Sequence, residues 1–206
     1  MKKTYLILSG LILILLAVNC KPAPDNRNNF DNKSEKRIFY GNKRNELLNR
    51  ADITLRCLKQ RDFKKLALLV HNKGVTFSPY AFVEDRAVKF TADQLKVLKL
   101  KDKFLWGHYD GSGDSIDLSV DDYFKKFVFN QDFTQAQHIG IDKLVKKGNT
   151  ISNIDKVFPK AHFVEYHFPG IDPQYEGIDW TSLRLVFEEA EGQLMLVGVV
   201  HDAWTI

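Results

Sequence analysis

The alternation of apolar and polar positions is clearest in the last part of the chain. Two apolar runs, residues 183–187 and 194–200, flank the polar turn 188–192, which ends in Gly192. β-Branched and aromatic residues on both sides of a glycine-containing turn predict an antiparallel β-hairpin. Nearly every position of both runs is apolar, so both faces of this part of the sheet are expected to be covered. The hairpin is therefore expected to be the platform on which the earlier elements pack.

Helical periodicity dominates the region before the strands. Apolar residues recur at helical spacing between residues 43 and 60, and Asp62 is placed to cap a second helix that ends at Gly74. Thr91 and Ser119 each begin a capping-box pattern, which predicts a further short helix at each position. The segments expected to be extended are 75–83, 104–109, 135–141 and 161–168.

Helices that come first and strands that come last predict an α+β fold, with N-terminal helices packed on a C-terminal antiparallel β-sheet. Pro79 has no backbone N–H, so the extended segment around it is expected at a sheet edge or at a bend. The chain is expected to divide into a leader over residues 1–19, a flexible tether over 20–42 and a single domain over 43–206.

The leader has the pattern of an export signal. Lys2 and Lys3 precede the apolar run 5–18, and the run stops just before Cys20. A cysteine at this position resembles the lipobox of bacterial lipoproteins, in which the signal peptide is cleaved before the cysteine and the thiol carries the lipid. Asn19 departs from the small residue that usually precedes that cysteine, and an uncleaved membrane anchor is the alternative.

The lipobox resemblance implies a palmitate-bearing Cys20 that holds the protein on a membrane, in the extracytoplasmic part of a bacterial cell envelope, with the outer membrane allowed. The tether that follows is polar, Asn-rich and interrupted by prolines, which is typical of a flexible segment. A lipidated Cys20 leaves Cys57 as a single cysteine, so no intrachain disulfide is available, and Cys57 is expected in the core.

The charge balance is only weakly basic. The chain has 30 Lys and Arg against 26 Asp and Glu, and removal of Lys2 and Lys3 with the leader leaves 28 basic residues. Such a small excess argues against a nucleic-acid partner. The basic residues are concentrated over residues 20–65, beside the expected anchor, where anionic head groups would attract them. A solvated tether with a basic helix face is the alternative.

The order of the expected elements resembles the NTF2-like, cystatin-related cone fold: two opening helices, a short strand with a helix, and long C-terminal strands over residues 43–206. The closing string VFEE..GQLMLVGVVHDAWTI is similar to the last strands of such domains. The chain also resembles uncharacterised exported bacterial proteins that carry strings such as GVTFSPY, WGHYDGSGD and DWTSLRLVFEE. The cone resemblance implies a pocket on the concave face of the sheet, whereas the lipoprotein resemblance implies no established activity.

One loop resembles a calcium-binding loop. Asp110, Ser112 and Asp114 alternate like its first three ligands, and Asp121 stands at its last position. Two departures weaken the match, because Ser115 replaces the required glycine and Asp121 replaces a bidentate glutamate. A tight turn is the alternative. None of the six histidines has zinc-motif spacing, and no motif implies a cofactor.

The candidates for acid–base chemistry lie on the predicted strands. Glu165 and His167 are two residues apart, so they share one face of their strand. His201 and Asp202 lie near the end of the closing strand. In an NTF2-like pocket a carboxylate–imidazole pair could abstract a proton. The alternative is that Glu165 and His167 form the polar face of a half-exposed strand.

The aromatic residues in the predicted strands either line a pocket for a small apolar ligand or pack in the core. No catalytic signature is present elsewhere. The sequence therefore favours a lipid-anchored extracytoplasmic protein that binds a ligand or a protein partner and has no catalytic activity. The alternative is an enzyme of hydrolase, isomerase or dehydratase type that uses a Glu or His base in an NTF2-like pocket.

Overall fold

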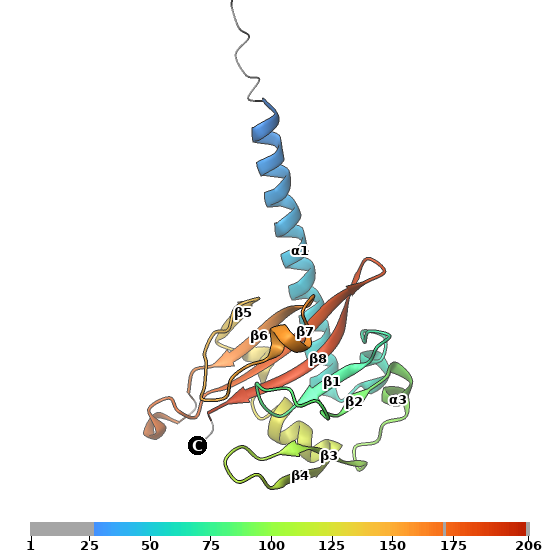
Figure 1. Ribbon diagram of the computed structural model, residues 1–206, viewed down its shortest axis with the longest axis vertical. Coiled ribbons are helices and arrows are strands. Elements are labelled where there is room, and N and C mark those ends of the chain that lie inside the picture. Colours follow the sequence, from blue (N-terminus) through green and yellow to red (C-terminus); the bar gives the residue numbers. More distant parts are fainter. Residues whose placement is uncertain (1–26, 171, 205–206) are drawn as a thin grey trace, which may run out of the picture. The chain divides into compact units, whose positions relative to one another are not determined.

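The computed structural model describes residues 27–170 and 172–204, with side chains described from Gly41 onwards. Residues 39–206 form one compact unit, and the residues before them are a separate unit. The expected signal sequence, Cys20 and the first part of the tether lie outside the described residues. All elements discussed below, apart from the start of the first helix, belong to the unit 39–206 (Figure 1).

The first helix is longer than the sequence indicates. The apolar spacing predicts a helix over residues 43–60. The helix ends at Gln60 but begins at Arg27, so residues 27–42, predicted as a flexible tether, are helical. No proline follows Pro24 until Pro79, so nothing in the covalent structure stops the helix before residue 43. Apolar residues at helical spacing occur only in the part of this helix that packs against the rest of the domain. The helices are α1 (Arg27–Gln60), α2 (Phe63–Leu66), α3 (Ala92–Val97), α4 (Val120–Tyr123) and α5 (Ile154–Val157).

The short helices begin at the predicted caps. The carboxylate of Asp62 accepts a hydrogen bond from the Lys65 backbone N–H at 3.0 Å and caps α2. Thr91 forms a complete capping box with Gln94 at the start of α3. Ser119 caps α4, which continues as a π-helix over Phe124–Val128. Among the described residues, no helix combines the length and the apolar composition that crossing a bilayer requires.

Strands form a six-stranded sheet in the order β2-β1-β8-β7-β6-β5 and a two-stranded sheet of β3 and β4 (Figure 1). The strands of the large sheet are β1 (Val75–Ser78), β2 (Lys89–Phe90), β5 (His138–Ile141), β6 (His162–Phe168), β7 (Thr181–Ala190) and β8 (Gln193–Ala203). The small sheet pairs β3 (Lys103–His108) with β4 (Ser115–Ser119), a strand that the sequence did not indicate. Two 3₁₀ turns, Phe133–Gln135 and Pro173–Tyr175, complete the list.

The α+β class is correct, but the large sheet is mixed and not purely antiparallel. β1 pairs in parallel with β8, with Phe77 opposite Val199. β1 is therefore an inner strand, and Pro79 lies at the bend that follows it. A parallel pair is joined by a long crossover, so its register leaves no local sequence pattern. This is why the sequence could not reveal it.

The closing hairpin forms as predicted. β7 and β8 pair antiparallel and are joined by Glu191 and Gly192, whose φ angles of 52° and 73° are both positive. Positive φ at both central residues defines a type I′ turn, whose twist matches that of the flanking strands. Both faces of the hairpin are buried, so the sheet is covered on both sides as expected.

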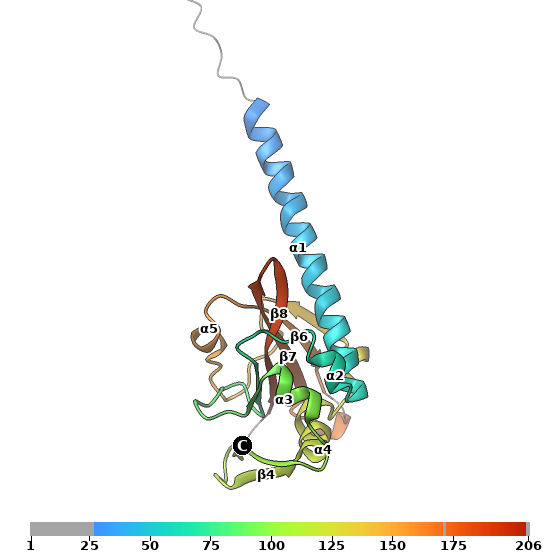
Figure 2. The same cartoon turned by 90° about the vertical axis from the view of Figure 1, so that its right-hand side faces the viewer.

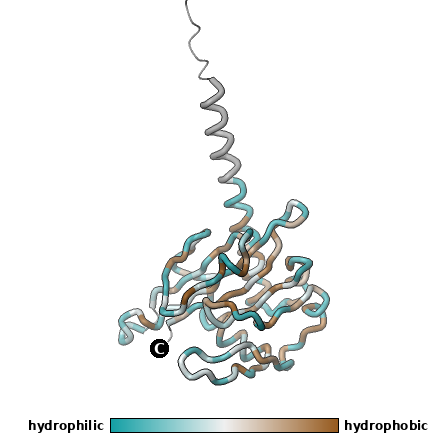
Figure 3. Tube along the Cα trace, viewed as in Figure 1, coloured by the Kyte–Doolittle hydropathy of each residue, from teal (hydrophilic) through white to brown (hydrophobic). Residues whose placement is uncertain are grey.

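Two separate clusters cover the two faces of the sheet. The view in Figure 2 places the α1–α2 end of the compact unit on one side of the sheet and α5 on the other. The helix-side cluster includes Leu55, Leu58, Phe77, Trp106, Tyr123, Phe124, Leu183, Leu185 and Phe187. The cluster on the α5 side consists of Val83, Ile154, Phe158, Phe163, Val186, Val197 and Val200. Hydrophobic stretches of the chain accordingly concentrate in the central strands, and hydrophilic stretches lie at the outer loops (Figure 3).

Aromatic rings fill much of the helix-side cluster. Phe77 contacts the rings of Phe90, Trp106, Tyr123 and Phe124, at centroid distances between 5.8 and 6.4 Å. The ring of Trp106 stacks on that of Tyr123 at 3.7 Å. These rings pack against one another in the core, so they are not the lining of an open apolar pocket.

We expect Phe77→Ala to lower the free energy of unfolding by about 3–5 kcal/mol, because it removes a ring that is 1% exposed and leaves a cavity among four aromatic neighbours. The matched control is Phe82→Ala, at a ring that is 50% exposed, which should cost about 1 kcal/mol or less. Urea unfolding of both variants measures the difference. Equal costs would contradict the packing described for Phe77.

Candidate functional site

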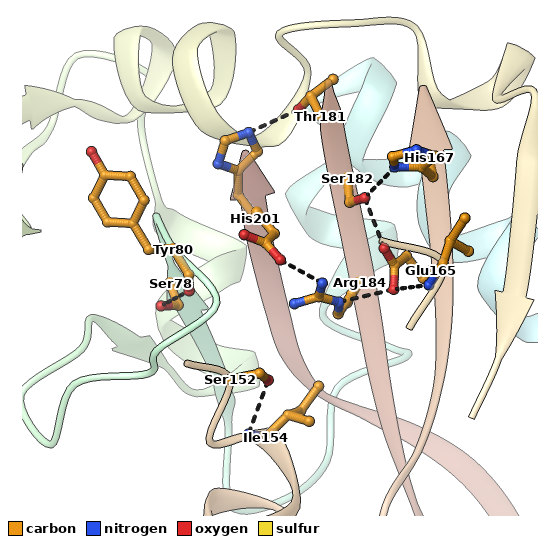
Figure 4. A network of polar contacts seen from close by, with 12 residues as sticks. Ser78, Tyr80, Ser152, Ile154, Glu165, His167, Thr181, Ser182, Arg184 and His201 are labelled. Atoms are coloured by element: carbon orange, nitrogen blue, oxygen red, sulfur yellow. Dashed lines mark hydrogen bonds and ion pairs between the residues drawn. The ribbon is translucent and has the colours of Figure 1, made fainter. Parts of the chain in front are cut away.

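Five polar side chains lie side by side on the α5 face of the sheet. They are Glu165 and His167 of β6, Ser182 and Arg184 of β7, and Asp202 of β8, and all five are buried. The strand register places Glu165 opposite Arg184, and Ser182 between His167 and Asp202. Because side chains alternate along a strand, these five point to one face. Figure 4 labels Glu165, His167, Ser182 and Arg184, which dashed lines join into one network.

A buried ion network forms the centre of this group. Arg184 donates from Nε to Glu165 Oε2 at 3.1 Å and from Nη2 to Asp202 Oδ2 at 2.5 Å. Glu165 Oε2 also accepts the backbone N–H of Val145 at 3.2 Å. The Arg184 side chain has no exposed surface, and a charge so far from water is tolerated only when it is paired. The two carboxylates are therefore what allows Arg184 to occupy this position.

One nitrogen of this guanidinium is not used. Arg184 Nη1 is buried and has no hydrogen-bond partner among the described residues. Most buried polar groups in proteins are paired, because an unpaired one loses its hydration without compensation. Nη1 shares its carbon atom with Nη2, so it lies beside the carboxylate of Asp202. Removal from water also raises the pKa of the Asp202 carboxyl, more than the neighbouring guanidinium lowers it.

The hydrogen bonds of Ser182 fix the tautomer of His167. The Ser182 hydroxyl donates to Glu165 Oε1 at 2.8 Å, so its oxygen accepts the remaining contact, from His167 Nδ1–H at 2.8 Å. Burial lowers the pKa of His167, which favours the neutral ring. A serine nucleophile needs a histidine nitrogen that accepts its proton, whereas here the histidine donates. The trio is therefore not a catalytic triad.

His201 lies on the opposite face of the sheet. Its Nδ1–H donates to the backbone oxygen of Pro79 at 2.8 Å, and its Nε2 accepts from the Thr181 hydroxyl at 3.0 Å. The ring also packs edge-on against Phe127, and burial lowers the pKa of His201 to about 4. Both ring nitrogens are used, so His201 fastens the bend after β1 to the end of β8.

The structure brings together two of the three candidate acid–base residues. Glu165 and His167 share a face, as their spacing predicts, and His201 is separated from them by the sheet. The alternative of a half-exposed polar face is wrong, because Glu165 is 0% and His167 is 2% exposed. Sequence reasoning missed Ser182 and Arg184, and it noted Asp202 only as the neighbour of His201. One signal was present: Arg184 is the single charge in the apolar run 183–187, and a buried arginine needs carboxylates on neighbouring strands.

A cleft of about 690 Å³ opens on the same face of the sheet, beside Asp202. Most of its lining comes from the loop 142–155, and the sheet contributes Phe163 and Asp202. Lys143, Lys147, Asp142 and Asp155 give the lining both signs of charge, and Leu144, Ile151 and Ile154 give it apolar surface. None of Glu165, His167 and His201 is among the lining residues.

Several hydrogen bonds hold the cleft loop against the sheet. The amide of Asn153 pairs with the backbone N–H and C=O of Val83 at 2.8 and 2.9 Å. The ammonium of Lys146 donates to the Gly177 backbone oxygen at 3.1 Å and lies 5.5 Å from the Trp180 ring centroid. With the Val145–Glu165 contact, these bonds join the loop to three separate parts of the domain. The loop that forms most of the cleft wall is therefore held in place by specific contacts.

The candidate calcium ligands each have a different partner or location. Asp110 accepts a hydrogen bond from the Thr150 hydroxyl at 2.8 Å, and Ser112 and Asp114 lie in the turn that closes the β3–β4 hairpin. Asp121 lies in α4 and forms an ion pair with Lys125 at 2.6 Å. In the part of the chain that the structure describes, no three His, Cys, Asp or Glu side chains are grouped as metal ligands.

Comparisons of the chain with protein-family profiles, curated proteins and solved structures find no match. The chemistry of the site is therefore inferred from its own groups. Glu165 and His167 are enclosed by internal hydrogen bonds, whereas Asp202 is part of the lining of a cleft that has charged and apolar walls. Such an arrangement is suited to holding a ligand.

We expect His201 to make the protein less stable in acid. The ring stays neutral in the folded state down to a pKa of about 4, whereas it takes up a proton near pH 6.5 when unfolded. Between these values the unfolded state binds more protons, so the free energy of unfolding falls as pH drops from 6.5 towards 4, by up to about 3 kcal/mol. Urea unfolding at several pH values measures this slope.

His201→Gln should flatten the slope, because glutamine does not titrate. A slope that is equally steep in wild type and His201→Gln would refute the assignment of His201 as a buried neutral ring.

Proposed function

We propose that this protein is a lipid-anchored, extracytoplasmic binding protein of a bacterial cell envelope, without catalytic activity, that holds a small polar ligand in the cleft beside Asp202. The cleft is the observation that carries the proposal. Its volume of about 690 Å³ lies within the range of small-molecule sites, and the buried residue Asp202 is part of its lining. The mixed polar and charged lining favours a polar ligand over an apolar one.

The environment of the candidate bases supports binding over catalysis. A general base needs an oxygen or nitrogen that can reach the substrate proton. Both oxygens of Glu165 already accept hydrogen bonds, from Ser182 on one side and from Arg184 and Val145 on the other. An NTF2-like enzyme would need Glu165, His167 or His201 to face its substrate, and all three are enclosed.

The lipid anchor is proposed from the sequence. Cys20 follows directly on the apolar run of the leader, in the position of a lipobox cysteine. The other cysteine is a poor candidate for modification, because Cys57 is buried in the helix-side core and its thiol pKa is raised by that burial. Cys20 is therefore the residue that we propose to hold the protein on the membrane.

We also propose that the domain is a variant of the NTF2-like cone. The element order supports this relationship: α1 and α2 open the domain, β1 and α3 follow, and the long strands β7 and β8 close it. The α1–α2 end covers one face of the sheet, which is what the cone arrangement requires. We likewise propose that the chain is related to the exported bacterial lipoproteins that it resembles in sequence.

Cys20→Ser should abolish lipidation. The full chain is produced in a bacterium that receives an alkyne analogue of palmitate, and labelling is read after coupling to a fluorophore. Wild type and Cys57→Ser should both be labelled and should partition into the detergent phase, whereas Cys20→Ser should do neither. Labelling that persists in Cys20→Ser would refute the proposed anchor.

Thr150→Trp should block the cleft. The larger side chain fills space between the loop and the sheet, while the control Thr150→Val removes only the hydroxyl that bonds Asp110. The probes are a panel of small amines, carboxylic acids, amino acids and sugars, tested by thermal unfolding and by ligand-observed NMR. At least one probe should bind wild type and Thr150→Val but not Thr150→Trp. Binding that survives in Thr150→Trp, or no binding at all, would contradict the proposed function.

A further inference from the structure

The large sheet ends at a strand whose outer side is open. β5 is the last strand in the order β2-β1-β8-β7-β6-β5, and Figure 1 shows it at the outer margin of the sheet, beside β6. Its strand partner among the described residues is β6, with Ile139 opposite Tyr166 and Ile141 opposite Val164. The outer side of such an edge strand presents backbone donors and acceptors with which another strand can pair.

The register shows which backbone groups of β5 point outward. The Asp142 N–H donates to the Phe163 backbone oxygen at 3.0 Å, so residue 142 stands at a hydrogen-bonded position of the β5–β6 pair. Hydrogen-bonded and non-hydrogen-bonded positions alternate along an antiparallel pair, so every second residue of β5 bonds to β6. Ile139 and Ile141 are the residues in between, and their N–H and C=O groups therefore point away from β6, towards the open edge.

The chain that follows β5 leaves this edge uncovered. Asp142 has a φ of 50°, which turns the chain sharply at the end of the strand. The next segment runs inward over the sheet, because the Val145 N–H donates to Glu165 of β6. Ile139 is accordingly 54% exposed. The outer side of β5 is therefore accessible to a second chain.

β5 also lacks the features that normally prevent pairing at a sheet edge. Such features are a very short strand, an outward lysine, a proline or a β-bulge. The opposite edge strand, β2, is protected in this way, since it has two residues and one of them is the exposed Lys89. The sequence of β5, HIGI, contains no lysine or proline, and its register with β6 is regular. Its open edge is instead flanked by the side chains of two isoleucines.

The sequence of β5 is complementary to itself. If two β5 strands pair antiparallel about Gly140, Ile139 of one copy lies opposite Ile141 of the other, and every outward N–H and C=O group gains a partner. The isoleucines lie on the helix-side face in both copies, so they form apolar contacts with one another. His138 lies opposite Asp142 of the second copy, so no like charges face each other.

We infer that the protein forms a homodimer through β5, in which two antiparallel β5 strands join the large sheets of two copies into one continuous sheet. A second copy fits this edge because β5 itself supplies the apolar and charged partners that the edge requires. One short strand from each copy makes a small interface, so dissociation in the micromolar range is expected. The dimer depends neither on the proposed ligand nor on the lipid anchor.

Light scattering of the purified full chain in detergent, corrected for bound detergent, tests the dimer. The mass of wild type should rise from one chain towards two as the protein concentration increases from about 1 to about 300 µM. Ile139→Lys should stay monomeric over the same range, because its ammonium would lie among the isoleucines of the second copy. Wild type that stays monomeric throughout would overturn the inference.

Ile151→Lys is the matched control. It makes the same substitution at an isoleucine outside β5 that is 81% exposed, and it should dimerise like wild type. All three proteins carry the same leader and anchor, so association of lipid chains does not explain a difference between them. A dimer that persists in Ile139→Lys, or an equal loss in both variants, would refute pairing through β5.

Spin labels test the register and leave both isoleucines unchanged. The label is placed on His138→Cys in the full chain with Cys20→Ser, where the remaining Cys57 is buried. In the register centred on Gly140, the two Cα atoms of residue 138 are about 14 Å apart. Dipolar broadening of the electron paramagnetic resonance spectrum should therefore appear at dimer-forming concentrations. A dimer without this broadening would place the interface elsewhere and overturn the inference, even if Ile139→Lys fails to fold.

Discussion

Arg184 imposes the strongest constraint on this fold. A guanidinium with no exposed surface requires carboxylates within hydrogen-bond reach, and these come from the two strands that flank β7. The pairing of β6, β7 and β8 must therefore keep its register, since a slip of one residue would move Glu165 or Asp202 to the other face. The cleft loop depends on the same group, because Val145 is bonded to Glu165. One buried charge thus links the sheet, the loop and the cleft.

The two faces of the sheet have different chemistry. The helix-side face is filled by aromatic and aliphatic side chains, with His201, Thr181 and Asn130 as a satisfied polar chain at its edge. The α5 face combines a small apolar cluster with the ion network. Packing alone explains the first face. The second face keeps charges in a place where apolar residues of similar volume would often serve stability as well, which is why we propose the binding role for it.

The end of β8 connects these two faces. Asp202 points into the ion network, and its neighbour His201 points into the helix-side core and fastens Pro79. The parallel pairing of β1 with β8 brings Pro79 within reach, and Asn153 holds Val83, which follows the same bend, against the cleft loop. The position of the cleft wall is thus fixed by contacts between segments that are far apart in the chain.

The sequence by itself determined the parts of this protein that depend on local patterns. Alternation and turn residues gave the hairpin β7–β8, the side-chain oxygens of Asp62, Thr91 and Ser119 gave the starts of three helices, and a two-residue spacing placed Glu165 and His167 on one face. Only the tertiary structure decided the parallel β1–β8 pair, the pairing of Arg184 with Glu165 and Asp202, the burial of the candidate bases and the cleft. These depend on which distant segments meet and which side chains lose their contact with water, and no local spacing carries that information.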